Sequence, residues 1–182
     1  MNRVHLLAAA AALAALGGCA SPESATPMAA ARAAGPKAVA TLSPTTGNTA
    51  AGTVVFEQHG DHVMVTAKLT GLKPNQEHGF HAHEKGDCSS GDGMSTGGHF
   101  NPGGKPHGPQ DAEHHAGDLP ALKADANGNA QASFHLTGVT LGSGTNDLVG
   151  RGLVVHAAPD DYKTQPTGNS GARIACGVIA RS

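Results

Sequence analysis

The sequence predicts an all-β domain over residues 37–182, built from short strands and many tight turns. Apolar and polar residues alternate in several short stretches, which is the period of a half-buried strand. Glycine is abundant, with 26 of 182 residues, while aromatic residues are only 3%. No long helical repeat of apolar residues follows residue 36. Short strands at this spacing indicate a sandwich or a barrel.

Residues 1–18 are predicted to be a lipoprotein signal peptide. Arg3 gives a positive start, and the apolar run 6–16 is too short to span a bilayer as a mature helix. The run ends in LGGC at 16–19, which resembles a bacterial lipobox, in which Cys19 would become the new N-terminus and carry lipid. An ordinary signal peptide with an incidental cysteine is the alternative. Since Ala20 rather than Asp follows Cys19, we expect an outer-membrane anchor in the cell envelope, on the periplasmic export route.

Residues 19–36 are small, polar and proline-containing, and they are predicted to be a flexible tether before the domain at 37–182. Charged residues make up only 14% of the chain, which argues against a highly charged disordered protein. The formal net charge of −2 provides no basic footprint for nucleic acid. The net charge says little else about the ligand, which local fields decide.

The clearest strand is DHVMVTAKL at 61–69, where Val63, Val65, Ala67 and Leu69 share one face. A turn at 58–61 connects it to the preceding strand. Asn127-Gly128 predicts a hairpin turn, because both residues tolerate positive φ. The predicted strands are 37–42, 53–57, 61–69, 76–83, 122–124, 130–136, 152–157 and 174–180.

Seven of the twelve histidines lie between His78 and Asp118, dispersed among turn residues. The glycine- and proline-rich segment 84–118 has no strand pattern, so we expect a functional loop. His81 and His83 should face the same side of a strand, with Phe80 facing the core. Imidazoles with one carboxylate suit copper and zinc. The further candidate ligands are His99, His107, His115, Asp118 and, on a second strand, His156.

The remaining histidines are predicted to lie outside this site. His78 is expected to be buried and hydrogen-bonded, and His114 to be solvated. His59 and His62 lie at a turn, and His135 lies on the polar side of its strand. Of the three cysteines, Cys88 and Cys176 remain as an even pair if Cys19 is lipidated, and a bridge between them would suit an exported protein.

Five segments, HGFHAHEKGDC, GGHFNP, HHAGDLPAL, GLVVHAAPDD and GARIACGVIA, resemble the signature segments of the copper/zinc superoxide dismutase family. The likeness is greatest to its bacterial periplasmic branch and spans about residues 37–180. It implies an eight-stranded Greek-key β-barrel, an immunoglobulin-like sandwich, with long metal-binding and electrostatic loops. It also implies an enzyme that converts superoxide to dioxygen and hydrogen peroxide, with copper and zinc as cofactors.

The resemblance implies specific roles for residues of this chain. Copper would be bound by His81, His83, His99 and His156. Zinc would be bound by His99, His107, His115 and Asp118. His99 would bridge the two ions, releasing copper and taking up a proton during the reaction. Asp160 would be the carboxylate outside the ligands, Arg173 would attract and hydrogen-bond the superoxide anion, and Cys88 and Cys176 would form the family's disulfide.

Some features depart from the family or stay open. The segment between His156 and Arg173 is short and lacks the acidic-plus-lysine set with which the eukaryotic branch guides substrate, so Lys85 and Lys163 are candidate substitutes. Monomer and homodimer remain equally open. The alternatives to an enzyme are a dismutase-like protein that stores or delivers copper or zinc, and a structural lipoprotein ordered by zinc. A complete ligand set together with Arg173 favours the enzyme.

Overall fold

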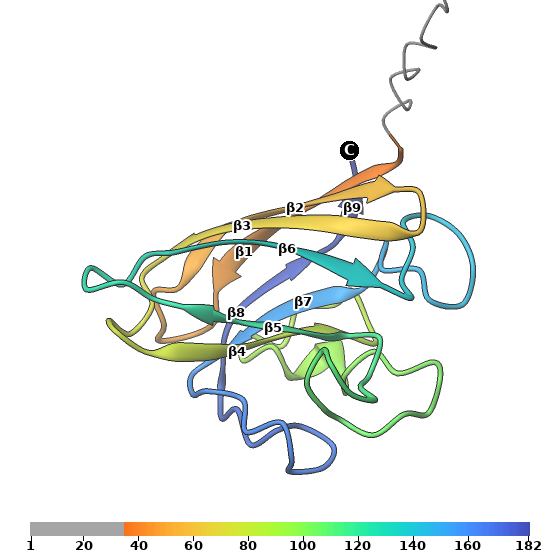
Figure 1. The fold of residues 1–182 in the computed structure, drawn as a ribbon. Helices are drawn as coiled ribbons and strands as arrows, with labels where there is room; N and C mark the ends of the chain where they lie inside the picture. The colour runs from red at the N-terminus through yellow and green to blue at the C-terminus, as the bar shows by residue number, and fades with distance from the viewer. Residues whose placement is uncertain (1–34) are drawn as a thin grey trace, which may run out of the picture. The chain divides into compact units, whose positions relative to one another are not determined.

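The computed structural model describes residues 35–182, which form an all-β domain (Figure 1). The predicted signal peptide, Cys19 and residues 19–34 of the predicted tether lie outside the described residues. No helix in the described part is long and apolar enough to cross a membrane. The strands are β1 (Lys37–Pro44), β2 (Ala51–His59), β3 (His62–Thr70), β4 (Glu77–His83), β5 (Asp118–Lys123), β6 (Ala130–Thr137), β7 (Gly152–His156), β8 (Arg173–Val178) and β9 (Ala180–Arg181).

The eight main strands form a nearly closed antiparallel barrel, which confirms the predicted fold. Their order is β5-β4-β7-β8-β1-β2-β3-β6, and β9 pairs with β1. β3 pairs with β6 and β4 pairs with β7, so the chain crosses between the two halves as in a Greek key. Figure 1 shows β1, β2, β3 and β6 on one side and β4, β5, β7 and β8 on the other, where the long loops after β4 and β7 extend outward.

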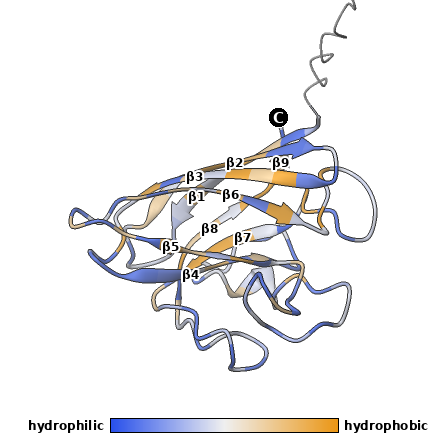
Figure 2. Ribbon diagram, in the orientation of Figure 1, coloured by the Kyte–Doolittle hydropathy of each residue, from blue (hydrophilic) through white to orange (hydrophobic). Residues whose placement is uncertain are grey.

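The barrel interior is filled by the inward face of every long strand. In β3 the predicted residues Val63, Val65, Ala67 and Leu69 are buried and the intervening residues are not. Each methylene removed from water contributes about 0.8 kcal/mol, so this alternation fixes the register of the strand. Figure 2 shows hydrophobic segments along the strands and largely hydrophilic loops.

Several strand bounds differ from the sequence predictions, and two of these differences concern β5 and the turn after it. β5 begins at Asp118 rather than at 122, because it is an edge strand and therefore tolerates Pro120, which donates no hydrogen bond. The connection at Asn127-Gly128 is a turn, and of these two residues only Gly128 has a positive φ. Within residues 35–182, however, β5 and β6 form no ladder with each other. The two strands instead terminate the open seam of the barrel.

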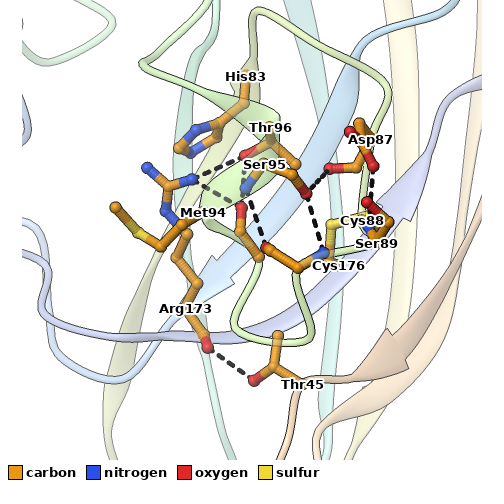
Figure 3. Close-up of a disulfide and its surroundings, with 12 residues drawn as sticks. Thr45, His83, Asp87, Cys88, Ser89, Met94, Ser95, Thr96, Arg173 and Cys176 are labelled. Carbon is orange, nitrogen blue, oxygen red and sulfur yellow. Dashed lines mark hydrogen bonds between the residues drawn. A yellow bond between two sulfur atoms is a disulfide. The ribbon is translucent and has the colours of Figure 1, made fainter.

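The long segment after β4 has little regular structure of its own. It contains one 3₁₀ turn, η1 (Met94–Thr96), and a bridge between His83 and His99. The predicted disulfide between Cys88 and Cys176 is confirmed, and it attaches this segment to β8 (Figure 3). The loop therefore lies against the barrel wall formed by β4, β7 and β8.

Candidate metal centre

Four buried histidines converge on the outer face of the barrel wall. His81 and His83 lie on β4, whose alternate residues Phe80 and Ala82 point into the core. β7 pairs with β4 and carries His156, and the bridge to His83 brings in His99. One ring nitrogen from each of the four lies within 4.8 Å of the others. We call these residues the four-histidine group.

A second buried group lies beside it, formed by His99, His107, His115 and Asp118, again with ligand-type atoms within 4.8 Å of one another. Asp118 starts β5 and is the register partner of His81, so the sheet places the carboxylate next to the first group. Its oxygens lie 2.9 Å from Nδ1 of His99, 3.0 Å from Nδ1 of His107 and 3.2 Å from Nδ1 of His115. We call these residues the aspartate group.

His99 belongs to both groups and presents a different nitrogen to each. Its Nδ1 contacts Asp118 at 2.9 Å, while its Nε2 is buried without a hydrogen-bond partner. Its ring centroid lies 4.0 Å from that of His81 and 5.4 Å from that of His115. The imidazole of His99 therefore lies between the two groups.

Asp160, in the loop after β7, connects the groups a second time. Its carboxylate accepts hydrogen bonds from Nε2 of His81 at 2.6 Å and from Nε2 of His107 at 2.8 Å. The backbone N–H of Tyr162 donates to the same carboxylate at 2.8 Å. These contacts lower the pKa of Asp160 below its usual range even though burial alone would raise it.

The geometry coincides with a family match that covers most of the chain. The family model for copper/zinc superoxide dismutase matches residues 50–179. The chain belongs to the copper/zinc superoxide dismutase family.

Among solved structures, it is similar to a double mutant of a SOD-like protein from Bacillus subtilis, with 36% identity, a TM-score of 0.71, and coverage of 78% of this chain and 96% of that one. It is also similar to the clock protein EA4, with 41% identity, a TM-score of 0.72, and coverage of 79% and 93%.

The donor atoms fit the copper and zinc that dismutases of this family bind. Within residues 35–182, five buried ring nitrogens lack hydrogen-bond partners, and they belong to His81, His83, His99, His107 and His156. An unpaired buried polar atom is costly, so such a concentration indicates ligands for metal ions. Nδ1 of His107 lies 3.0 Å from Asp118 but is not aligned as a hydrogen bond, which is the arrangement of two ligands around one ion.

The hydrogen bonds on the opposite ring nitrogens determine which nitrogen is available. Nδ1 of His83 donates to the Gly97 carbonyl at 3.0 Å, and Nδ1 of His156 donates to the Gly171 carbonyl at 3.1 Å. A carbonyl only accepts, so the proton lies on Nδ1 and Nε2 keeps a free lone pair. Both Nε2 atoms are among the buried ring nitrogens without a hydrogen-bond partner.

The protonation state of the four-histidine group favours metal binding. Burial lowers the pKa of His83 to about 2, although its hydrogen bond to the Gly97 carbonyl acts in the opposite direction. Burial likewise lowers the pKa of His156 to about 3 and of His99 to about 4. These imidazoles are neutral at pH 7, the form that binds metals.

The aspartate group differs from the four-histidine group in its protonation, because the pKa of His107 is raised and not lowered. Burial would lower the pKa of His107, but the adjacent carboxylates of Asp118 and Asp160 outweigh it and raise the pKa to about 9. Burial would raise the pKa of Asp118, but the adjacent imidazoles of His107, His115 and His99 hold it below its usual range. The metal-free group thus holds a proton that a bound cation would displace.

Arg173, the first residue of β8, lies beside the four-histidine group. Its Nη1 donates to the Gly93 carbonyl and to Thr96 Oγ1, both at 2.8 Å, and its Nη2 donates to the Gly97 carbonyl at 2.7 Å. Figure 3 shows its guanidinium next to the His83 ring. Arg173 also lines a pocket of about 210 Å³ together with His99, His156 and Met94. The pocket thus brings a permanent cation to the histidine face.

Several supporting residues were not predicted from the sequence. Gln165 clamps the backbone of His107, accepting from its N–H at 2.7 Å and donating to its carbonyl at 2.9 Å. The Tyr162 ring stacks parallel to His107. Gly168 has a positive φ of 64°, and a Cβ there would lie 2.0 Å from an Asp160 oxygen. None of these carries a local sequence signal, because each acts through a neighbour that is distant in the chain.

The other predicted histidines and lysines can be placed as well. His78 is buried and donates from Nδ1 to the His156 carbonyl at 2.8 Å, outside both groups, and His114 is half-buried. Lys85 and Lys163 are exposed and do not line the pocket beside Arg173.

Proposed function

We propose that this chain is an active superoxide dismutase that converts two superoxide ions and two protons into dioxygen and hydrogen peroxide. One observation carries the proposal: two complete ligand groups share His99, with Arg173 facing the four-histidine group. The copper ligands would be His81, His83, His99 and His156. The zinc ligands would be His99, His107, His115 and Asp118.

Bound copper would supply one-electron redox chemistry, and zinc, which is redox-inert, would hold the loop. The chain's own residues do the rest. The guanidinium of Arg173 is permanently charged, so it attracts the superoxide anion and orients it in the pocket. Nε2 of His99 would take up a proton and deliver it to the reduced oxygen, while Nδ1 stays on the side of Asp118. Asp160 keeps the rings of His81 and His107 in position.

The test is superoxide decay catalysed by protein loaded with copper and zinc. We expect decay far above the background of free copper, abolished in His81→Ala. Arg173→Ile should slow the decay while copper stays bound, because Arg173 contacts no converging ligand atom. Absence of decay in fully loaded wild-type protein would refute the proposal.

A binding protein without turnover is the second candidate, and it is favoured by one finding. The two solved relatives are named as a SOD-like protein and a clock protein rather than as dismutases. Metal analysis with the decay assay separates the candidates: a full load of one copper and one zinc per chain without decay would support storage or delivery.

We further propose that the enzyme works in the cell envelope, anchored by lipid on Cys19, where it would remove superoxide at the periplasm. The basis is the sequence LGGC at 16–19 after an apolar run. A fatty-acid analogue fed to cells should label the wild-type protein and not Cys19→Ala. Unlabelled wild type would refute the anchor without bearing on the dismutase proposal.

A further inference from the structure

Three histidines that the metal centre does not use meet on the outer face of the opposite half of the barrel. His59 ends β2 and His62 begins β3, and the two are register partners across the turn at Gly60-Asp61. β6 lies beside β3, and its His135 is the register partner of Met64, which places it diagonally opposite His62. We call His59, His62 and His135 the surface histidine cluster.

The pleat of the sheet places all three side chains on the solvent side. Val63, which follows His62, is completely buried, and Leu136, which follows His135, is only 3% exposed. Since successive side chains point to opposite faces, both histidines point outward. The side chain of His62 is 32% exposed and that of His59 is 50% exposed. The cluster is therefore open to ions in solution.

The His62 ring lies close to the rings of both other histidines. The His62 ring lies 4.8 Å from the His135 ring and 5.9 Å from the His59 ring, measured between centroids. On a tetrahedral ion with metal–nitrogen bonds of about 2.0–2.1 Å, two ligand nitrogens lie about 3.3 Å apart. The ligand nitrogens of these three histidines do not all lie within 4.8 Å of one another, as those of the metal centre do. The rings must therefore rotate about χ1 and χ2 to bind one ion. Partly exposed side chains can do this without repacking the core.

The surrounding groups leave a lone pair available and do not repel a cation. Nδ1 of His62 lies 3.2 Å from Asp61 Oδ1, an acceptor that favours the proton on Nδ1 and leaves Nε2 free. Nε2 of His59 is 3.9 Å from Glu57, beyond hydrogen-bond length. The Lys37 ammonium beside Glu57 is balanced by that carboxylate. The net local charge is thus neutral to negative.

We propose that the surface histidine cluster binds a divalent transition-metal ion through its three imidazoles, as a site separate from the metal centre. Imidazole ligands suit Cu²⁺ and Zn²⁺, and Cu²⁺ stands highest in the general affinity order. The fourth position on the ion is left to solvent. The site depends only on side chains of β2, β3 and β6, so it does not rest on the proposed enzymatic function.

The test uses protein whose metal centre is already loaded with copper and zinc, titrated with Cu²⁺ by calorimetry and followed by metal analysis. We expect one further Cu²⁺ per chain. His62→Gln should weaken its binding by about 10-fold or more, because even partners outside the ligand shell contribute that much. Thr137→Ala, on the same outer face in register with His62, should bind as wild type does.

His81→Ala separates the two sites, since it should lose copper from the metal centre and keep binding at the cluster. Circular dichroism should show the wild-type fold for each of the three variants, His62→Gln, Thr137→Ala and His81→Ala. A loaded wild-type protein that takes up no further copper would overturn the proposal. Equal affinity of His62→Gln and wild type would overturn it too, because the extra ion would then lie elsewhere.

Discussion

Replacing Asp160 with asparagine tests how the two ligand groups are coupled. The carboxylate, 2% exposed, accepts from His81 at 2.6 Å and from His107 at 2.8 Å. Asparagine offers one acceptor oxygen and one donor NH₂, so only one of the two histidines keeps its partner. The other must move its proton to Nδ1, the nitrogen that converges with the ligand atoms. A hydrogen bond to a charged group contributes about 1.5–3 kcal/mol, which corresponds to roughly 10- to 100-fold in affinity.

The assay is competition with chelators for copper and for zinc, measured separately. We expect Asp160→Asn to lose about 10- to 100-fold in affinity for one metal and much less for the other. Asp161→Asn is the matched control, since Asp161 is exposed and its carboxylate accepts hydrogen bonds from Lys163 and Thr164 of its own turn. If Asp160→Asn binds both metals as wild type does, the carboxylate does not set the tautomers of His81 and His107, and the coupling argued from these distances is wrong.

Three further predictions follow from the same contacts. Gly168→Ala should lower the free energy of unfolding by more than about 1 kcal/mol and weaken zinc binding, because its Cβ would lie 2.0 Å from Asp160. Gly138→Ala is the control, since Gly138 also has positive φ but open space around it, and this variant should bind zinc as wild type does. Thermal unfolding and zinc titration test both variants. Replacing both Cys88 and Cys176 with serine should lower the free energy of unfolding by about 2–5 kcal/mol in denaturant titrations, and an unchanged midpoint would contradict it. The metal-free protein should become less stable in chemical denaturation as the pH falls from about 6.5 toward 4. Burial lowers the pKa of His83, His156 and His99 to about 2, 3 and 4, so in this range these histidines take up protons only in the unfolded chain. His107, with a pKa raised to about 9, has the opposite effect on stability but only above pH 6.5, so a stability that rises between pH 6.5 and 4 would refute the reasoning.

The strands could be predicted wherever one face is buried and the other is not. The alternation in DHVMVTAKL gave β3 within one residue at each end, because burial of Val63, Val65 and Leu69 imposes period two. The start of β5 could not be found in this way, since Asp118 and Leu119 are both buried and Pro120 discourages a strand. The turn signal at Asn127-Gly128 was real, but a local signal cannot tell whether the two flanking strands pair or end an open seam.

The metal centre was predictable because its residues carry chemistry that is rare elsewhere in a chain. Histidines on one strand face and in a glycine-rich loop, with five family-like segments, were enough to select the residues that the structure brings together. The supporting contacts were not predictable. Gln165 and the carbonyls of Gly97 and Gly171 act by position alone, and nothing in their residue types distinguishes them from other loop residues.

The carbonyl of Gly97 shows why the loop and the barrel must be assembled together. It accepts from Nδ1 of His83 at 3.0 Å and from Nη2 of Arg173 at 2.7 Å, so one oxygen positions both the His83 ring and the guanidinium of Arg173. The disulfide closes this contact from both sides, because Cys88 lies in the loop that carries Gly97 and Cys176 lies on β8 with Arg173. The aspartate group depends on Asp160, which also bonds to His81, and on the space at Gly168. The two groups therefore share His99 and Asp160, while the disulfide lies on the side of Gly97 and Arg173. We expect loss of the disulfide to weaken metal binding by the four-histidine group before it weakens metal binding by the aspartate group.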